Sequence, residues 1–310
     1  MIEPIPSEPD NLPGTYPGSS RRLSMMDFWM FILMIIWGSN FVILKSALEV
    51  LPPMVINGLR FSIGALALGL IFKLNGKKLR LPRREWPILI WLAFQGNALY
   101  QLIFLTALHL TTVANSALIL TANPVWVVVF NAWRGHERLG KRATLGVIMA
   151  IAGVTLVIVG GQRVEIGGAT LVGDLLTLVA SLIFAATTLL SHKPYLRNPT
   201  PALAFWGVLW GGAFQIMFAV PNLVHQDWSV FSLPLVLAIC YSGIFSIGIG
   251  NVIWNHGVKV LGTGRPSIYT YLEPVVAGIT AAIFLNEPLT PYLFVGAAAV
   301  LVGVVLVQSG

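Results

Sequence analysis

Two ionisable side chains lie within long apolar runs of this sequence, where a charge is costly to bury. They are Arg60 and Glu273. A charged group at membrane depth costs about 2.5–3.5 kcal/mol on insertion scales, so each one needs a partner or a water-filled space. Glu273 is a candidate cavity-lining or proton-titrating group, and a structural carboxylate tied to the backbone is the alternative. For Arg60 a structural role is favoured, because its long stem can reach a membrane interface.

A second set of side chains could bind a small molecule that is polar at one end and apolar at the other. It consists of aromatic rings, amides and a hydroxyl, at Trp37, Gln95, Tyr100, Thr121, Asn123, Phe184, Asn251, Trp254, Asn255 and Tyr269. Polar groups this dense within apolar runs must point into a helix bundle, as interhelical hydrogen bonds or as the lining of a pathway. We predict that these residues and Glu273 bind a substrate, with rings on its apolar part and amides on its amino and carboxylate groups.

Two prolines directly follow members of this set, at Asn123-Pro124 and Glu273-Pro274. Proline removes a helix hydrogen bond and leaves the carbonyl four residues earlier without its donor. In lipid that carbonyl must meet protein, water or substrate. We therefore predict that Pro124 and Pro274 are hinges beside a central cavity; kinks that serve only helix packing are the alternative.

Signatures of catalysis are absent from the sequence. It has no phosphate-binding glycine loop ending in Lys-Ser or Lys-Thr, no HExxH and no GxSxG. The single cysteine, Cys240, excludes a cysteine-ligated metal cluster. We predict no catalytic residue, no metal and no cofactor, and we take the chain not to be an enzyme.

Membrane-spanning helices must position these side chains. Only 10% of the 310 residues are charged and the mean hydropathy is +0.80, whereas soluble domains carry about 25% charged residues. A bilayer core needs about 20 residues of helix to cross it. The sequence predicts ten such spans, at 28–50, 53–73, 86–108, 111–133, 142–161, 169–191, 201–222, 232–255, 266–285 and 290–308. Residues 1–26 are polar and proline-rich, which predicts a disordered tail or an expression remnant.

The basic residues give the orientation of these spans. Of the 19 Lys and Arg residues, 16 fall on the face that holds both termini, and only Lys45 and Arg163 fall on the other. This bias places both termini in the cytoplasm. It also explains the net charge of +7 without a nucleic-acid partner, which we exclude.

The sequence contains an internal repeat. A shift of 150 residues superimposes Asn123-Pro124 on Glu273-Pro274, Glu137 on Glu287, Gly146 on Gly296 and Gly153 on Gly303; a shift of 147 superimposes Asp27 on Asp174 and Trp37 on Phe184. We predict repeats at 27–161 and 162–310. Each holds five helices, an odd number, so the second must be inverted in the membrane. Inverted repeats are a transporter architecture, with the substrate site near the midplane.

Several motifs carry a resemblance to a known family. They are Trp37-Gly38-Ser39-Asn40-Phe41, Leu59-Arg60-Phe61, Leu272-Glu273-Pro274 and Leu285-Asn286-Glu287. Over residues 27–308 the chain resembles the drug/metabolite transporter superfamily, and within it the EamA-type exporters, including the aromatic amino-acid exporter group. The resemblance implies ten helices around a central cavity, cytoplasmic termini, and export of amino acids or related small amphiphiles from a bacterial cytoplasm.

The resemblance also implies individual cavity positions. Tyr100, the residues before Pro124, and Trp254-Asn255 match cavity positions of the aromatic exporters. Asn123 stands where that group tends to have an aromatic residue, and Phe184 stands where a tryptophan is common. These departures weaken any restriction to aromatic substrates.

The whole pattern predicts a secondary transporter of the bacterial inner membrane that works by alternating access. Its predicted partners are an amino acid or small metabolite, the lipid bilayer, and protons as the candidate coupling ion, carried by Glu273. The sequence specifies no oligomer beyond the single chain. The alternatives are an exporter of cationic drugs, an intramembrane transferase, and a channel or receptor.

Overall fold

A computed structural model describes residues 24–135, 139–160, 168–191, 201–261 and 264–309, and these are helical without any strand, which confirms the predicted all-α class. The first half contains α1 (Met25–Leu48), α2 (Pro53–Leu74), η1 (Arg83–Glu85), α3 (Trp86–Leu92), η2 (Ala93–Leu99), α4 (Tyr100–Leu110), α5 (Val113–Thr121), α6 (Asn123–Trp133) and α7 (Lys141–Gly160). The second contains α8 (Ala169–Ser191), α9 (Pro201–Val224), η4 (Trp228–Val230), α10 (Leu233–Tyr241), η5 (Ser242–Ile249), α11 (Gly250–Leu261), α12 (Gly264–Tyr269), α13 (Leu272–Phe284) and α14 (Pro291–Ser309). The boundary predicted between the repeats, at 161/162, and most of the predicted tail lie outside the described residues.

Within the described part of the chain, nine helical stretches are long and apolar enough to cross a bilayer. The predicted ninth span, 266–285, is interrupted close to Pro274, where a kink or hinge was predicted. It is divided into α12 and α13, which are separated by Thr270 and Tyr271. Pro274 has no N–H to offer the Thr270 carbonyl, which instead accepts a bond from the Glu273 N–H at 3.2 Å.

A matching interruption lies in the first half. α5 ends at Thr121 and α6 begins at Asn123, so the helix is broken one residue before Asn123-Pro124. The shift of 150 residues places Ala122 on Leu272, directly after the break between α12 and α13. Both copies of the repeat therefore contain a discontinuous helix at their proline.

Two π-helical segments, η2 and η5, are also related by this shift. A π-helix disturbs the regular hydrogen-bond ladder, so its carbonyls need partners from elsewhere. The Gln215 amide donates to the carbonyls of Asn97 and Ala98 in η2, at 3.1 and 2.9 Å. The Trp37 indole donates to the Ser246 carbonyl in η5 at 3.2 Å. Hydropathy cannot distinguish such a segment from α-helix, and the sequence did not predict either one.

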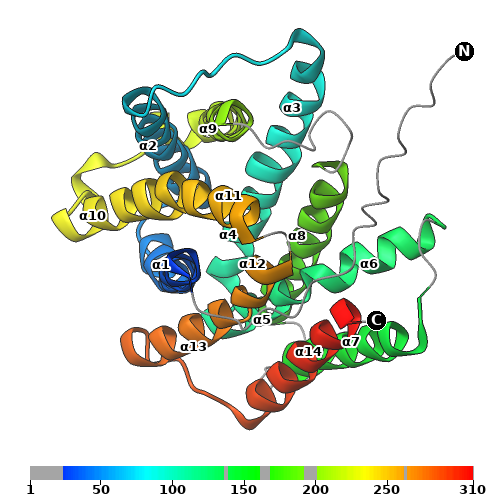
Figure 1. Cartoon of the computed structure of the whole chain (residues 1–310). Helices are drawn as coiled ribbons and strands as arrows, with labels where there is room; N and C mark the ends of the chain where they lie inside the picture. Colours follow the sequence, from blue (N-terminus) through cyan, green and yellow to red (C-terminus); the bar gives the residue numbers. More distant parts are fainter. Residues whose placement is uncertain (1–23, 136–138, 161–167, 192–200, 262–263, 310) are drawn as a thin grey trace, which may run out of the picture.

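Helices α7 and α14 lie side by side and show the repeat symmetry most directly (Figure 1). An added Cβ at Gly146 would lie 2.5 Å from the Gly303 carbonyl oxygen, and one at Gly153 would lie 2.8 Å from that of Gly296. Shifting by 150 residues exchanges these two contacts. These repeat-related glycines therefore pair across the two halves and permit a close approach of α7 to α14.

The other helices also pack mainly across the halves. α1 contacts α13 and its counterpart α8 contacts α6, whereas α2 contacts η5 and its counterpart α9 contacts η2. Each contact between the halves therefore has an equivalent contact in which the first-half and second-half elements are exchanged. This pattern is the one expected of two inverted repeats about a shared axis.

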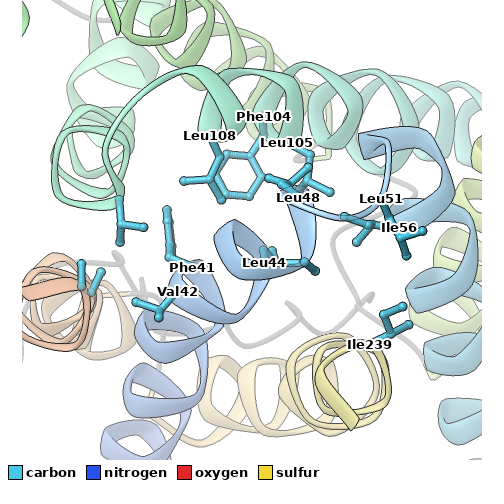
Figure 2. Packing of buried hydrophobic residues seen from close by; sticks show 14 of the residues in the cluster. Phe41, Val42, Leu44, Leu48, Leu51, Ile56, Phe104, Leu105, Leu108 and Ile239 are labelled. Carbon is cyan, nitrogen blue, oxygen red and sulfur yellow. The ribbon is translucent and has the colours of Figure 1, made fainter. Parts of the chain in front are cut away.

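The largest apolar cluster fixes α1 within this arrangement. Phe41 on α1 lies beside Phe104 and Leu108 on α4, and Leu48 on α1 lies near Leu105 (Figure 2). The rings of Phe41 and Phe104 meet edge to face, with their centroids 5.3 Å apart. This packing holds the Trp37-Gly38 motif, one turn before Phe41, against the second half of the chain.

Candidate functional site

Tyr100 lies at the centre of the candidate site. It is the first residue of α4, directly after η2, and its ring lies 5.0 Å from that of Phe184 on α8 and 5.9 Å from that of Phe104. Its hydroxyl interacts electrostatically with Glu273 on α13 and Arg60 on α2. The structure thus brings three of the predicted site residues, Tyr100, Phe184 and Glu273, into one neighbourhood.

Glu273 lies in the first turn of α13, beside the helix break. Its side chain is partly buried, and it has no hydrogen-bond or ion-pair partner among the described residues. Gly38 permits this placement: a Cβ there would lie 2.7 Å from Val276 Cβ and 2.9 Å from the Glu273 carbonyl oxygen. α1 therefore packs directly on the backbone that carries Glu273, and the carboxylate is left available.

Trp37 and Trp254 form a second group next to the first. Their ring centroids are 5.5 Å apart, and both pack with a cluster of buried residues on α1 and α11. The Trp37 N–H is already bonded to the Ser246 carbonyl of η5. Trp37 consequently offers a ligand only its ring.

Two predicted site residues carry buried oxygens without a partner. They are Gln95 in η2 and Asn123 at the start of α6, whose side-chain oxygens accept no hydrogen bond among the described residues. The indole N–H of Trp126, one turn after Asn123, is likewise buried and donates none. Buried polar groups are almost always bonded, so each exception needs an explanation such as water or a ligand. These acceptors are suited to an ammonium or amide donor.

The hydrogen bonds of four other predicted site residues lead elsewhere. Thr121, Asn251 and Asn255 each bond a carbonyl of their own helix or of the adjoining η5 segment, at 2.7 to 2.8 Å. The Tyr269 hydroxyl donates to Asp27 at 2.8 Å. Pro124 is the second residue of α6 and Pro274 is the third residue of α13, so each lies in the first turn after a break.

The expectation that Arg60 reaches an interface was wrong. Its side chain is 2% exposed, and its guanidinium donates to Asn57 at 3.0 Å, to Ser242 at 3.1 Å and to Gln101. None of these three partners is among the predicted site residues. Arg60 meets Gln101 and Ser242 only because α2, α4 and η5 pack together, and the sequence pattern does not predict that packing.

Two buried carboxylates lie away from this neighbourhood and are related by the repeat. Asp27 on α1 accepts from Tyr269, and Asp174 on α8 accepts from Thr111 and from Asn115 at 3.1 Å. The bond to Asp27 ties α1 to α12 of the other half. The bonds to Asp174 tie α8 to α5 of the other half and to Thr111, which lies just before α5. The shift of 147 residues was the signal that could have identified them as a pair.

The hairpin between α4 and α5 has a charged cap at each side. The Lys45 ammonium donates to the carbonyls of Leu108, His109 and Thr111, at 2.7, 3.0 and 2.6 Å. The Glu287 carboxylate accepts from the N–H groups of Val113 and Ala114, at 2.9 and 3.3 Å. These charges match the dipoles of the two helix ends. Glu137, the counterpart of Glu287 in the repeat, lies outside the described residues.

Within the described residues, no group of three or more His, Cys, Asp or Glu side chains could hold a metal ion. The arrangement instead combines stacked aromatic rings, unpartnered acceptors and a single carboxylate beside a helix break. That set can bind a small molecule with an apolar part and a polar end.

Comparison with known proteins gives the family. A sequence model described as the EamA-like transporter family matches this chain twice, over residues 24–159 and 171–309. The first match covers essentially α1 to α7, and the second covers α8 to α14. Together the matches leave out little beyond the N-terminal tail and the link between the halves.

Individual relatives are similar at low identity over most of their length. A Bacillus subtilis protein named uncharacterized transporter YetK is 26% identical, covering 87% of this chain and 83% of the relative. A Salmonella typhimurium protein named probable amino-acid metabolite efflux pump is 26% identical, covering 89% and 92%. A Streptantibioticus cattleyicolor protein named probable terminal-alkyne amino-acid exporter is 24% identical, covering 90% and 92%.

A solved crystal structure has the same fold. It superposes with a TM-score of 0.65 at 22% identity, covering 91% of this chain and 95% of that chain. At this identity the likeness establishes the helix arrangement alone.

Proposed function

Because this chain belongs to the EamA-like transporter family, we propose that it exports amino acids or related small amphiphilic metabolites by alternating access. The family and the relatives named above are transporters, and two of those relatives are named for amino-acid export. The carrier function is the part that the family supports most broadly. The amino-acid cargo is the finer part of the proposal.

The observation that carries the proposal is the pair of repeat-related helix breaks at Asn123-Pro124 and Glu273-Pro274. Discontinuous helices near the membrane midplane form the substrate sites of many inverted-repeat transporters. Here one break carries the unpartnered Asn123 oxygen and the other carries the unbonded Glu273 carboxylate. Both groups would be available to a cargo bound between the two breaks, which supports the proposal.

In this mechanism the cargo enters a central cavity between the third, fourth, eighth and ninth spans. Tyr100, Phe184, Trp37 and Trp254 contact its apolar part, and Asn123, Gln95, Asn251 and Asn255 bind its polar groups, with Thr121 and Tyr269 at the margin. Pro124 and Pro274 act as hinges about which the halves rock. Glu273 carries the coupling proton.

The protein would lie in the bacterial inner membrane with both termini in the cytoplasm. The 16 basic residues on one face, against two on the other, support this orientation. Cargo would therefore move from the face that holds the termini to the opposite face. A C-terminal reporter that is active only in the cytoplasm should be active when fused to Gly310, and activity of a periplasmic reporter there would contradict the orientation.

Counterflow tests the proposal. Purified protein in liposomes loaded with an unlabelled amino acid should transiently accumulate the same labelled amino acid, because a carrier exchanges cargo across the membrane. The panel would hold L-leucine, L-threonine, L-phenylalanine, L-cysteine and a cationic dye. Exchange of the dye alone would replace the amino-acid cargo with the drug alternative, and uptake without trans-stimulation would exclude a carrier.

A further inference from the structure

Arg60 holds a fixed positive charge inside the bundle without an anion to balance it. Its side chain is 2% exposed, and its three hydrogen bonds go to the neutral oxygens of Asn57, Gln101 and Ser242. No Asp or Glu forms an ion pair with it in the described part of the chain. A guanidinium cannot lose its proton to escape the cost of burial, so the charge remains.

The surroundings of Arg60 hold the guanidinium rigidly. Its partners come from α2, α4 and η5, and the ring of Phe61 lies 5.5 Å from its central carbon. Asn57 in turn donates to the Gln101 carbonyl at 3.0 Å, which fixes the cradle itself. Such preorganisation removes much of the entropy cost of binding a ligand.

The guanidinium retains donors for a ligand. Of the five N–H groups of an arginine, one is on Nε and two are on each terminal nitrogen. Nε, Nη1 and Nη2 each make one bond here, so one donor remains on each terminal nitrogen. Paired donors on a planar fork match the two oxygens of a carboxylate.

Tyr100 connects this group to the candidate site. Tyr100 interacts electrostatically with both Arg60 and Glu273, and it directly precedes Gln101. A molecule lying against the Tyr100 ring is therefore close to the cradle of Arg60.

We propose that Arg60 binds the carboxylate of the cargo, so that the protein carries molecules with a free carboxylate and rejects their uncharged or cationic analogues. This proposal rests on the carrier function proposed above and adds the chemical class of the cargo. A free carboxylate supplies the anion that Arg60 lacks, whereas an amide or a cationic drug leaves the buried charge unbalanced. Because Arg60 is 2% exposed in this structure, the Tyr100 side chain, and not the hydrogen-bonded cradle, must move aside when the cargo binds.

The test compares each amino acid with its α-amide, which keeps the side chain and the ammonium but loses the carboxylate charge. Competition against counterflow, and ligand-induced shifts in the melting temperature of purified protein, give two readouts for the same pair. Wild type should prefer the free acid by roughly tenfold or more, the ratio expected of a charge-assisted hydrogen-bonded pair.

Two variants probe the role of Arg60 itself. Gln101→Glu places a carboxylate of nearly the same shape against Arg60, so it should lower the acid preference to about twofold or less while the protein stays folded. Arg60→Gln should lower the preference in the same way. Gln226→Glu, which adds the same carboxylate in the link between α9 and α10 instead of beside Arg60, is the matched control and should retain the preference.

The outcomes separate this proposal from the function on which it rests. A wild-type protein without acid preference, or an unchanged preference in Gln101→Glu, would overturn the role of Arg60 even if counterflow succeeds. If the free acid raises the melting temperature more than its amide does, but counterflow shows no trans-stimulation, the carrier function is contradicted and the carboxylate site is retained.

Discussion

In the proposed mechanism, coupling to protons depends on the carboxylate of one residue, Glu273. It has no hydrogen-bond or ion-pair partner among the described residues, and it lies at the break before α13. We expect Glu273→Gln to abolish the dependence of transport on a pH gradient in proteoliposomes, because the amide cannot bind and release a proton. Counterflow at equal pH should persist, since exchange needs no net proton movement.

Glu287→Gln is the matched control, because Glu287 belongs to a second Glu-Pro pair and binds the backbone of α5. Its pH-gradient dependence should resemble that of wild type. An unchanged dependence in Glu273→Gln would remove this residue from coupling. A wild type that ignores the gradient would point to facilitated diffusion.

The buried carboxylate of Asp174 should matter for stability more than for cargo binding. It accepts hydrogen bonds from Thr111 and Asn115, and replacing it with alanine leaves both donors buried without a partner. Each orphaned group costs about 1–3 kcal/mol. Asp174→Ala should therefore lower the melting temperature in detergent clearly, with the amino-acid preference of the remaining folded protein unchanged.

Asp227→Ala provides the exposed comparison. Hydrogen bonds from the Ser229 hydroxyl and N–H hold the pKa of Asp227 below its ordinary value, but the side chain lies in an exposed link between α9 and α10. We expect no measurable change in melting temperature. Equal effects of the two substitutions would contradict a structural role for Asp174.

At the scale of the elements, the interlock of α7 and α14 defines the repeat axis. A Cβ at Gly303 would lie 2.6 Å from both the Ala150 nitrogen and the Gly146 carbonyl oxygen, so Gly303→Ala must separate the helices. Overpacking of this kind costs about 1–3 kcal/mol. The melting temperature of the purified variant should fall accordingly.

Gly278→Ala in α13 is the control, because a Cβ there meets nothing within 4 Å. It should leave stability unchanged or raise it slightly, since alanine also restricts the unfolded chain. A Gly303→Ala protein as stable as Gly278→Ala would contradict close packing of α7 on α14.

The elements also mark where prediction from sequence succeeds and where it stops. Hydropathy placed the spans within a few residues, and the two prolines indicated the positions of both breaks. It could not separate η2 and η5 from α-helix, because a π-helix has the same apolar composition. It also missed the Arg60 cradle, since Gln101 and Ser242 meet Arg60 only through the register of packed helices.

The candidate site was predictable to a similar degree. The groups Tyr100–Phe184–Glu273 and Trp37–Trp254 consist of residues that the sequence predicted for the site. They were predictable because polar side chains in an apolar run must point into the helix bundle. The side chains of Asn251 and Asn255 donate to backbone carbonyls one turn before them. The sequence did not predict these hydrogen bonds. The role in cargo binding proposed for Asn251 and Asn255 would require these hydrogen bonds to open.

At the scale of the whole molecule, the two repeat-related carboxylates connect the halves at two places. Asp27 joins α1 to α12, and Asp174 joins α8 to the α4–α5 hairpin. In an inverted repeat these contacts lie toward opposite membrane faces. Rocking of the halves should therefore open one contact while the other stays closed.

Distances between spin labels test this alternation most directly. In a protein with Cys240→Ser, one label pair at Phe28 and Ile268 reports on the contact between α1 and α12, and another at His109 and Leu175 reports on the contact beside Asp174. All four side chains are exposed in this structure. Adding a transported amino acid should widen one distance distribution and narrow the other. Distances that stay fixed, or that widen together, would contradict alternating access by two inverted halves.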